Sequence, residues 1–477
     1  MTELQDVISG PLHFVGVGGY GMSGLARVLA AMGSEVTGCD IRESSRVQWL
    51  RSEGVPVVLG HSADHLRGVR ALVYSTDVPG DNPEICAAKE AGLPLFHRSH
   101  LLAHLLSTFT ESVAVSGTHG KTSTTAMMAA VLESADFDPT VLVGGEISGP
   151  GVTARVGESD YLVAEACESD GSFVRYHPRH LIVTNLEPEH LEFYDDSFDQ
   201  LVKAFGRFMG NVHPRGVVVI NADDKLLTKV AEVTPGRVVL CSASGDQSAH
   251  YRAVDVALKG DHSEFSLFVR DKKLGRLTVA APGQHMVANA LQVAATAREI
   301  GCPLKAIESG LASYGGVARR FQRIGHAGEA LVVDDYAHHP TEIRATLQTA
   351  RGLAENRVIA VFQPQRHTRT HNLMEEFSRC FDASDELILT PIYAPPGQKP
   401  IPGVSSDSLA ERIRDRIALP IRLMENRTEI VSYLREVSAP GDVVITMGAG
   451  DIWKVAVELV QESGPMTSAG GLCSLGG

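Results

Sequence analysis

The stretch 116-SGTHGKT-122 stands between an apolar run at 113–115 and a helix-forming run at 124–133. The apolar run, Val-Ala-Val, predicts a buried strand, and the second run predicts a helix. A strand, a turn containing glycines, a Lys-Thr pair and a helix in this order predict a phosphate-binding loop in an α/β fold. A plain glycine turn is the alternative, but it gives the Lys-Thr pair no packing role.

Each residue type in this loop has a chemical reason to be there. Gly117 and Gly120 allow a tight turn that brings backbone N–H groups close to an anion. Lys121 can reach the terminal phosphate of a nucleotide, and the hydroxyl of Thr122 can hold Mg²⁺. Val115 stands where the full Walker pattern has its first glycine. The sequence therefore predicts a shortened phosphate loop, Gly-x-x-Gly-Lys-Thr.

Length and composition indicate a multidomain globular protein without a general nucleic-acid-binding surface. With 477 residues and a 44% apolar share, the chain is long enough for about two to four domains with their own cores. The net charge of -14 argues against a general nucleic-acid-binding surface, which needs clustered excess Lys and Arg. It still allows a local basic pocket for an anionic ligand.

Cysteine usage and hydropathy bear on the compartment. Seven cysteines are spread along the chain without a Cys-x-x-Cys pair, which is typical of reduced thiols in a cytoplasm. The chain has no apolar run of about 18 residues or more, and its N-terminus lacks a signal-peptide pattern. We expect a soluble, cytoplasmic protein without membrane insertion.

The N-terminal part carries a second glycine motif. Residues 13–21 predict an apolar strand that runs into Gly-x-Gly-x-x-Gly, followed by a helix-like run at 22–32 and a strand at 35–39 that ends in Asp40. This βαβ pattern is typical of a dinucleotide site and, taken alone, indicates NAD. The same geometry suits any nucleoside linked to a pyrophosphate. Further α/β alternation follows, and the first domain is expected to close near 106–109.

Polar residues follow the predicted strands of the central region. The strand at 161–164 delivers Glu165, and the strand at 181–184 delivers Asn185 and then His190. In such folds the carboxyl ends of parallel strands lie beside the phosphate loop, so Glu165 and His190 are predicted ligands of Mg²⁺. The polarity of an ordinary surface loop is the alternative.

A third α/β unit follows an antiparallel stretch. Residues 250–280 alternate apolar and polar side chains and predict an antiparallel edge hairpin. A strand at 330–333 leads into a polar segment with Thr341 as a possible helix cap. Further strands are predicted at 358–362, 386–390 and 443–447. Residues at the ends of these strands are Asp334, Tyr336, His338, Arg366 and Arg369.

Several motifs in one order identify a family. They are GVGGYGMSG at 16–24, the loop at 117–122, EACESDGSF at 165–173, NLEPEH at 185–190, the helix start at 285–289, RRF at 319–321, DDYAHHPTE at 334–342 and MGAGD at 447–451. From about residue 12 to about residue 459 the chain resembles the Mur ligases, the ATP-dependent ligases of peptidoglycan precursor synthesis.

The resemblance implies a three-domain α/β architecture. A Rossmann-like domain for a UDP-sugar is expected at 1–107, a central P-loop ATP-binding domain at 108–324 and a C-terminal Rossmann-like domain at 325–462. A disordered tail is expected at 463–477. In this family branch the first glycine motif looks like a cradle for the UDP diphosphate and not an NAD site.

The resemblance also implies a reaction. ATP phosphorylates the lactyl carboxylate of UDP-N-acetylmuramate, and the amine of L-alanine attacks the acyl phosphate and expels phosphate. The implied cofactors are ATP and Mg²⁺. The implied partners are these two small substrates, with no nucleic acid and no membrane, and the protein is expected to be a monomer or a homodimer.

Residue roles carry over where the motifs match. The implied catalytic residues are Lys121, Glu165, His190, Arg320 and His338. Nucleotide contacts are expected from Gly117, Thr118, His119, Gly120, Lys121, Thr122, Ser123, His285, Asn289, Arg320, Asp334 and Asp335, with His285 and Asn289 at the adenine and Asp334 or Asp335 at the ribose. Mg²⁺ is expected on Thr122, Glu165 and His190. The UDP-sugar is expected at Gly18, Gly19, Gly21, Met22, Ser23 and Asp40, and the amino acid and acyl phosphate at Tyr336, His338, Arg366 and Arg369.

A few positions depart from the family pattern. Met286 stands where many relatives have Asn, Cys167 replaces a usual Asp, and Gln365 stands where His is common. Lys203 lies near the place of a carbamylated lysine in other branches, but its register does not match.

Other functions stay open at this point. A recycling ligase that joins a murein tripeptide to UDP-N-acetylmuramate would have the same fold. An NAD-dependent oxidoreductase built on residues 12–40 leaves the phosphate loop unexplained. A non-catalytic nucleotide sensor would be expected to lack Lys121 or Glu165, and both are present.

Overall fold

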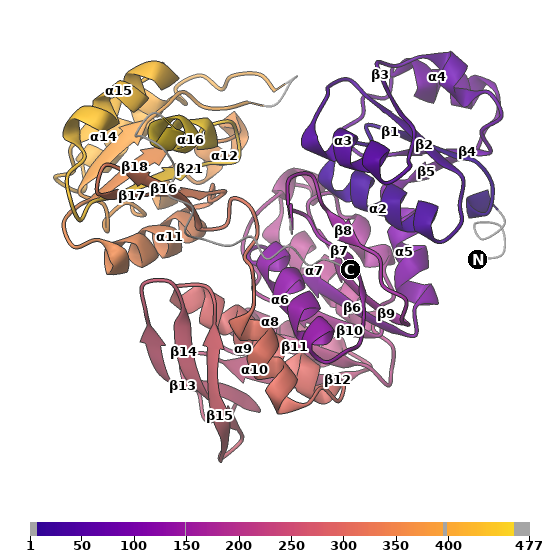
Figure 1. Cartoon of the computed structure of the whole chain (residues 1–477), viewed down its shortest axis with the longest axis horizontal. Helices are drawn as coiled ribbons and strands as arrows, with labels where there is room; N and C mark the ends of the chain where they lie inside the picture. Colours follow the sequence, from indigo (N-terminus) through magenta and orange to yellow (C-terminus); the bar gives the residue numbers. More distant parts are fainter. Residues whose placement is uncertain (1–6, 148, 395–397, 462–477) are drawn as a thin grey trace. The chain divides into compact units, whose positions relative to one another are not determined.

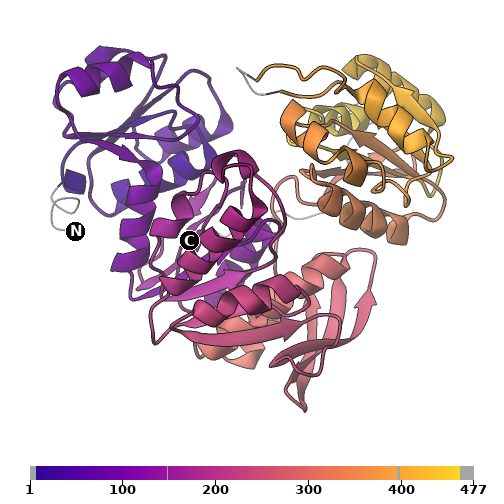
Figure 2. The ribbon, with the colours of Figure 1, turned by 180° about the vertical axis from the view of Figure 1, so that it is seen from behind.

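The computed structural model describes residues 7–147, 149–394 and 398–461. They form two compact units, the first ending at Ala318 and the second starting at Arg319. The first unit holds a five-stranded and a ten-stranded sheet, and the second holds a six-stranded sheet (Figures 1 and 2). The predicted α/β fold is confirmed. The tail predicted at 463–477 lies outside the described residues.

The first sheet is fully parallel, with the strand order β3-β2-β1-β4-β5 that is typical of doubly wound folds. Side chains alternate along each strand, so Phe14 packs with one group of helices and Val15 with the other. Its strands are β1 Leu12–Val15, β2 Val36–Asp40, β3 Val57–Leu59, β4 Ala71–Tyr74 and β5 Leu95–His97. On the Phe14 face lie α2 Tyr20–Ala31, α3 Ser45–Ser52 and α5 Arg98–Thr108, and on the Val15 face lie η1 Ala63–Leu66 and α4 Pro83–Glu90.

The second sheet has a parallel centre, in which β10, β6 and β9 are neighbours. Its full order is β15-β14-β13-β12-β11-β10-β6-β9-β7-β8. Its strands are β6 Glu111–Ser116, β7 Thr140–Leu142, β8 Ala154–Arg155, β9 Tyr161–Glu165, β10 His180–Val183, β11 Val217–Asn221, β12 Arg237–Ser242, β13 Tyr251–Leu258, β14 Ser263–Val269 and β15 Lys272–Val279. Its helices are α6 Lys121–Ser134, α7 Phe198–Gly210, α8 Lys225–Val230, α9 Gln284–Glu299 and α10 Leu304–Ala312, with short 3-10 turns η2 Ser172–Arg175, η3 Leu191–Phe193 and η4 Ala231–Val233.

Two cores cover the faces of this second sheet. One packs α6, α9 and α10 against Val113 and Val115 of β6. The other packs α7 against Ala114 and continues into the first sheet through Leu105 of α5. This continuous core explains why both sheets belong to one compact unit.

The antiparallel region is larger than the sequence pattern predicted. Residues 250–280 form three strands, β13 to β15, at the edge of the sheet, and not a two-stranded hairpin. The third strand begins with Lys272 and Lys273 and is exposed at its start. A polar beginning of this kind resembles a turn in the sequence, although β15 pairs with β14 along its length.

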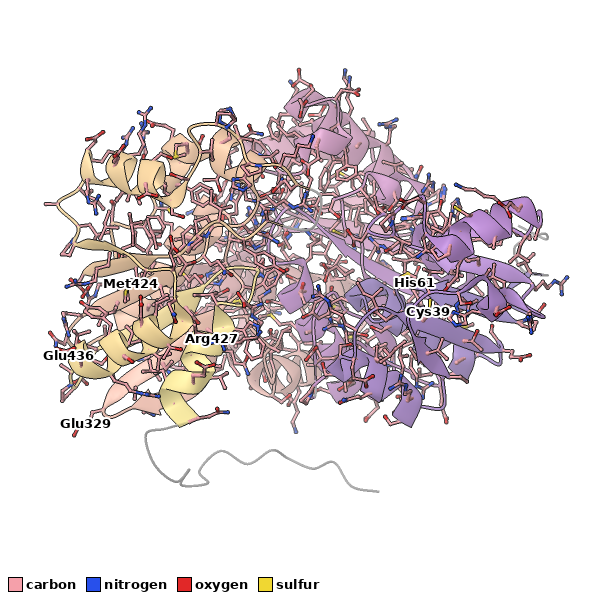
Figure 3. The ribbon with its side chains drawn as sticks, turned by 90° about the horizontal axis from the view of Figure 1, so that it is seen from above. Cys39, His61, Glu329, Met424, Arg427 and Glu436 are labelled. Carbon is pink, nitrogen blue, oxygen red and sulfur yellow. The ribbon has the colours of Figure 1, made fainter. Side chains whose placement is uncertain are left out.

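The third sheet has the order β16-β17-β21-β18-β19-β20, and all its pairs are parallel except β16 with β17. Its strands are β16 Gln322–Ala327, β17 Ala330–Asp335, β18 Val358–Phe362, β19 Glu386–Leu389, β20 Ile421–Leu423 and β21 Val443–Met447. Its helices are α11 Pro340–Leu353, α12 His367–Asn372, α13 Met374–Phe377, α14 Ser406–Arg414, α15 Arg427–Val437 and α16 Trp453–Gln461. Figure 3 labels Arg427, the first residue of α15. Residue 325, the predicted start of the third domain, lies within β16.

The cap predicted at Thr341 is wrong by two residues. The helix α11 begins at Pro340, and the side chain of His339 is the cap, accepting a hydrogen bond from the Thr341 amide at 3.4 Å. Glu342 completes the capping box by accepting from the amide of His339. Proline suits the first helical position because its fixed φ is helical and it needs no amide partner there.

The sequence led us to expect no membrane span and reduced cysteines. None of the helices in the described ranges combines the length and the apolarity that a membrane span requires. The six cysteines of the described chain, Cys39, Cys86, Cys167, Cys241, Cys302 and Cys380, carry free thiols.

Candidate functional site

The phosphate loop connects the end of β6 to the start of α6, as predicted. Gly117 has a φ of +129° and Gly120 a φ of +81°, conformations that favour glycine. A Cβ atom on Gly117 would lie 2.1 Å from Thr184 Oγ1, and one on Gly120 would lie 2.9 Å from Asn289 Nδ2. Both glycines are therefore required by backbone conformation and by close packing together.

Residues that follow β10 clamp this loop. Asn185 Oδ1 accepts from the His119 amide at 2.8 Å, and Asn185 Nδ2 donates to the His119 carbonyl at 3.1 Å. Thr184 Oγ1 donates to the same carbonyl at 2.5 Å. Thr118 Oγ1 accepts from the amide of Glu187 at 2.8 Å. Asn185 and Thr184 therefore hold the loop in shape, a role that neither the predicted strand at 181–184 nor the motif at 185–190 indicated.

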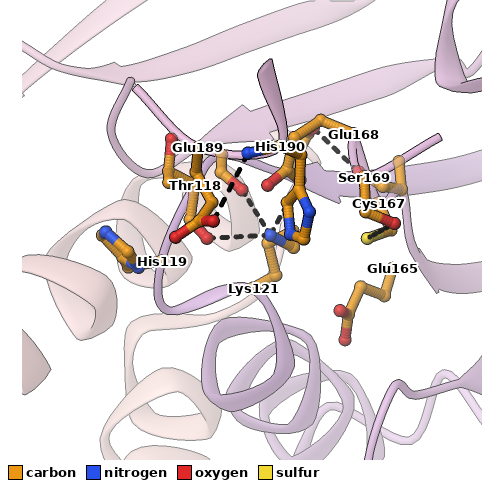
Figure 4. Close-up of polar contacts among 12 residues, drawn as sticks. Thr118, His119, Lys121, Glu165, Cys167, Glu168, Ser169, Glu189 and His190 are labelled. Carbon is orange, nitrogen blue, oxygen red and sulfur yellow. Dashed lines mark hydrogen bonds and ion pairs between the residues drawn. The ribbon is translucent and has the colours of Figure 1, made fainter. Parts of the chain in front are cut away.

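Lys121 is buried within the loop (Figure 4). Its Nζ donates to the carbonyl oxygens of Gly117 at 2.6 Å and Thr118 at 2.9 Å, and it lies 2.8 Å from Glu168 Oε2. Lys121 is 9% exposed and Glu168 is 1% exposed. Burial alone would lower the pKa of Lys121, but the Glu168 carboxylate raises this pKa above its ordinary value. Sequence reasoning did not assign Glu168 as the partner of Lys121, although the Glu-x-x-Glu spacing at 165–168 contained it.

Thr122 and Glu165, both predicted ligands of Mg²⁺, lie together. Thr122 Oγ1 donates to Glu165 Oε2 at 2.9 Å, and the amide of Gly144 donates to the same oxygen at 3.0 Å. Thr122 is at the start of α6 and Glu165 ends β9, the strand beside β6. A hydroxyl and a carboxylate at this edge form an oxygen donor set that suits Mg²⁺.

Gly144 gives a direct test of the position of Glu165. A Cβ on Gly144 would lie 2.5 Å from Glu165 Oε2, so Gly144→Ala is expected to push the carboxylate away from Thr122. Displacing a ligand by about 1 Å can cost up to about a hundredfold in rate, and we expect a ten- to hundredfold loss of kcat/KM with little change in Tm. Gly210→Ala, at a glycine with open space around it, is the matched control. Unchanged activity and Mg²⁺ dependence in Gly144→Ala would contradict this role of Glu165.

The third predicted metal ligand, His190, lies in the loop after β10. Its φ is +55°, and its Nδ1 is 4.0 Å from Glu192 Oε1. Figure 4 draws His190 with Glu189 in the same close-up as Lys121. Cys167, which replaces the usual Asp, is held by a contact of 3.2 Å with Ser169 Oγ. The role of His190 in binding a second ion stays a prediction.

The start of α9 carries the predicted adenine contacts. His285 is exposed in the first turn, and Asn289 is buried beside Gly120. Met286 is buried in the core between these two positions, so its side chain faces the protein interior.

Two further residues considered in the sequence lie on other helices. Ser123 is buried in α6, and Lys203 is exposed on α7.

The glycine turn of the first sheet is closed by Asp40. Asp40 Oδ2 accepts from the Gly18 amide at 2.9 Å, and a Cβ on Gly18 would meet this oxygen at 2.8 Å. Met22 and Ser23 are buried, and Ser23 Oγ donates to the carbonyl of Gly19 at 2.9 Å. Met22 and Ser23 therefore support the turn from within, and their side chains do not line an open surface.

Two arginines that sequence reasoning missed lie beside this turn. Arg46 Nε donates to the Gly18 carbonyl at 2.5 Å, and its guanidinium stacks 4.0 Å above the ring of Tyr20. A Cβ on Gly21 would lie 3.1 Å from an Arg98 nitrogen. Both arginines come from other segments of the chain, so no local pattern links them to the glycines. Each guanidinium is also paired with a carboxylate, Arg46 with Glu146 at 2.8 Å and Arg98 with Asp170 at 3.4 Å, so both charges are balanced within the protein.

In the second unit, the two aspartates that end β17 are buried. Asp334 accepts from Arg319 Nε at 3.0 Å and from Thr446 Oγ1 at 2.6 Å. Asp335 accepts from Thr346 Oγ1 at 2.9 Å, and burial raises its pKa to about 6 against the opposing charge of Arg320. Both carboxylates hold the unit together in this structure, and their contact with a ribose stays a prediction.

Tyr336 and His338 lie together just after β17. Their rings meet edge to face with centroids 5.3 Å apart, and the guanidinium of Arg320 lies 5.2 Å from the Tyr336 ring. His338 Nδ1 lies 2.8 Å from the Tyr336 carbonyl, which can only accept, so the proton is on Nδ1. In the neutral ring the lone pair is then on Nε2.

The predicted arginine pair follows β18. Arg366 has a φ of +66° and precedes α12, and Arg369 is buried within α12. Arg369 Nη1 donates to Gln365 Oε1 at 2.7 Å. Gln365, the departure noted in the sequence, is therefore a direct hydrogen-bond partner of Arg369.

Three sequence profiles match the chain in succession. "Mur ligase family, catalytic domain" matches 11–110, "Mur ligase middle domain" matches 115–297, and "Mur ligase, glutamate ligase domain" matches 319–450. Their order agrees with the three predicted domains, whose boundaries stay predictions.

Named relatives extend over nearly the whole chain. UDP-N-acetylmuramate–L-alanine ligase of Symbiobacterium thermophilum is 46% identical over 454 residues, which cover 94% of each chain. The crystal structure of UDP-N-acetylmuramate-alanine ligase from Thermotoga maritima has a TM-score of 0.80 at 30% identity, covering 94% of this chain and 98% of that one. A murein peptide ligase from Psychrobacter arcticus has a TM-score of 0.70 at 24% identity, covering 96% of this chain and 100% of that one, and this likeness shows the fold alone. With its phosphate loop, its three sheets and relatives of matching length, this chain belongs to the Mur ligase family.

Proposed function

We propose that the protein uses ATP and Mg²⁺ to join L-alanine to the lactyl carboxylate of UDP-N-acetylmuramate. The observation that carries the proposal is the phosphate loop with buried Lys121 and the Thr122–Glu165 pair at 2.9 Å. The extended similarity to ligases named for these substrates supports the choice of reaction.

The chemistry explains why such a loop is needed. A carboxylate does not react with an amine in water, so a carboxylate oxygen first attacks the γ-phosphorus of ATP and ADP leaves. The amine then attacks the acyl carbon, and phosphate leaves with the bonding electrons of the C–O bond. Lys121 stabilises the charge on the transferring phosphoryl group, and Thr122, Glu165 and His190 would hold the Mg²⁺ that neutralises the phosphates.

The remaining residues bind and orient the substrates. Gly18, Gly19 and Gly21 form the turn for the UDP diphosphate. The guanidinium groups of Arg46 and Arg98 lie beside it, where a diphosphate would compete for them with Glu146 and Asp170. His338 is suited to accept a proton from the incoming amine, because its Nδ1 proton is fixed on the Tyr336 carbonyl and its lone pair is on Nε2.

The arginine pair is expected to bind the carboxylate of the amino acid. Arg369→Ala should raise the KM for L-alanine by about tenfold or more, since a charge-assisted hydrogen bond contributes about 1.5–3 kcal/mol. The KM for ATP should stay near its wild-type value. Gln365→Ala is expected to have a smaller effect in the same direction, because it removes only the partner that positions Arg369. An unchanged KM for L-alanine in Arg369→Ala would contradict this assignment.

The decisive experiment measures phosphate release from ATP with UDP-N-acetylmuramate and a panel of amines. L-alanine should give the highest kcat/KM, with glycine and L-serine lower, since one methyl or hydroxyl group changes selectivity by only about 1–3 kcal/mol. A higher kcat/KM for the murein tripeptide would instead identify the recycling ligase. Absence of phosphate release with every amine would refute ligase activity altogether.

A further inference from the structure

A cluster of metal-ligating side chains lies in the first sheet, away from the phosphate loop. It lies on the face covered by η1 and α4, where Cys39 also packs with the apolar group around Val15. Figure 3 labels Cys39 and His61, two members that lie side by side. The members are His13 of β1, Cys39 of β2, His61 after β3, His65 of η1 and Glu84 of α4.

The ligand atoms of this cluster converge on Glu84. Cys39 Sγ lies 3.1 Å and His13 Nε2 lies 3.3 Å from Glu84 Oε2, and His65 Nδ1 lies 2.9 Å from Glu84 Oε1. One ligand atom from each of these four residues falls within 4.8 Å of all the others. Tetrahedral Zn²⁺ has bonds of about 2.0–2.3 Å, which place its ligands roughly 3.3–3.8 Å apart. The four side chains need only small shifts to reach that geometry.

The contacts of His13 orient its ring toward Glu84. Its Nδ1 lies 2.8 Å from Thr37 Oγ1, which is also 3.3 Å from the carbonyl of Leu12. Its Nε2 lies 3.3 Å from Glu84 Oε2 and has no well-directed hydrogen-bond partner in the described part of the chain. In the tautomer in which Nδ1 donates to Thr37, the Nε2 lone pair faces the carboxylate, and this tautomer is the one that can bind a metal ion. The Thr37 contact is the kind of outer hydrogen bond that orients a histidine toward a metal.

Burial increases the need for positive charge at Glu84. His13 is 2% exposed and Glu84 is 0% exposed. Within the described ranges, the ion-pair partners of Glu84 are histidines, and no Lys or Arg pairs with it. Glu84 Oε1 also accepts a hydrogen bond from the Ser62 amide at 3.0 Å, and a divalent ion would add the compensating charge for both this carboxylate and a Cys39 thiolate.

We propose that this cluster is a site for one Zn²⁺ ion, bound by His13 Nε2, Cys39 Sγ, His65 Nδ1 and the Glu84 carboxylate. Four protein donors of mixed sulfur, nitrogen and oxygen type favour Zn²⁺ over Mg²⁺, which prefers oxygen ligands and retains water. His61 and His65 are partly exposed, so an ion can enter from their side. Zn²⁺ binding to these four residues does not require that the proposed ligase activity is correct. Cys39 precedes Asp40, so the ion would fix the end of β2 next to the residue that closes the glycine turn.

The experiment uses the full-length protein, stripped with a chelator and reloaded with Zn²⁺ or with Co²⁺ as a spectroscopic probe. We expect one Zn²⁺ per chain that excess Mg²⁺ does not displace. The Co²⁺ form should show a thiolate charge-transfer band and the intense visible bands of a tetrahedral site. Cys39→Ser should lose the charge-transfer band, whereas the matched control Cys86→Ser, in the same sheet domain but outside the cluster, should keep it.

Two further variants keep the test decisive if Cys39→Ser does not fold. His65→Gln removes a partly exposed ligand, and Thr37→Val removes the hydroxyl that contacts His13 Nδ1 and the Leu12 carbonyl while keeping all four ligands. We expect Thr37→Val to weaken Zn²⁺ binding by about 10–100-fold, and His65→Gln to weaken it at least as much. Zn²⁺ should raise the Tm of the wild-type protein but not of His65→Gln at the same concentration. Less than stoichiometric Zn²⁺ in folded wild-type protein, a charge-transfer band that persists in Cys39→Ser, or unchanged affinity in His65→Gln would overturn the proposal.

Discussion

Lys121→Ala is expected to lower kcat at least about a hundredfold, because a charged donor to a transferring phosphoryl group contributes roughly 3 kcal/mol or more. The structure adds a second effect. Removing Lys121 leaves Glu168 buried without its ion pair, which typically destabilises a protein by about 3–5 kcal/mol. Activity and Tm should therefore both fall in this variant.

The double variant Lys121→Met with Glu168→Gln separates the two effects. It removes the unpaired buried charge, so its Tm should recover toward the wild-type value while kcat stays low. UDP-N-acetylmuramate binding, measured by calorimetry, should be retained, since Lys121 is distant in sequence and role from the glycine turn of the first sheet. Lys203→Ala, at an exposed lysine of α7, is the control. Recovery of kcat together with Tm would show that Lys121 has only a structural role.

Glu165→Gln is the substitution with the second largest expected effect. Glutamine has the same shape, and its carbonyl oxygen can still accept from Thr122 Oγ1 and from the Gly144 amide. The fold should be unchanged while one negative charge of the proposed Mg²⁺ site is lost. We expect kcat/KM at fixed Mg²⁺ to fall by roughly a hundredfold, since metal stabilisation of the transition state is worth several kcal/mol.

The dependence on Mg²⁺ concentration provides the sharper measurement for Glu165→Gln. The half-saturating concentration should rise, and added Mg²⁺ should restore part of the rate. Glu111→Gln is the matched control, because Glu111 lies at the opposite end of β6 and contacts His180 Nε2 at 2.9 Å. Wild-type Mg²⁺ dependence in Glu165→Gln would remove this residue from the metal site.

Much of the fold could be predicted from apolar runs that end in glycine or polar residues. β6, β10 and β21 are buried parallel strands, and such strands read as continuous Val, Ile and Leu segments. β15 could not be predicted as a separate strand, because an exposed edge strand tolerates a polar sequence. The cap of α11 was misplaced because histidine, which is not a common cap, takes that role in His339.

The candidate site was predictable only where its residues are close in sequence to a strand end. Lys121, Thr122 and Glu165 lie at the predicted edge because neighbouring parallel strands bring them there. The partners Arg46 and Arg98 come from separate helical segments, and their proximity to the glycine turn depends on tertiary packing. The link between Glu168 and Lys121 depends on side-chain direction, which the spacing of two glutamates does not specify.

The pairing of Lys121 with Glu168 has a consequence for which anions the loop admits. The lysine is already neutralised from within the protein, so a lone inorganic phosphate would gain little by entering and would compete with a carboxylate at 2.8 Å. A nucleoside triphosphate brings its own Mg²⁺ and contacts along its length, which can compensate for displacing Glu168. We therefore expect the ion pair to favour binding of the nucleoside triphosphate over the inorganic phosphate that the proposed reaction releases.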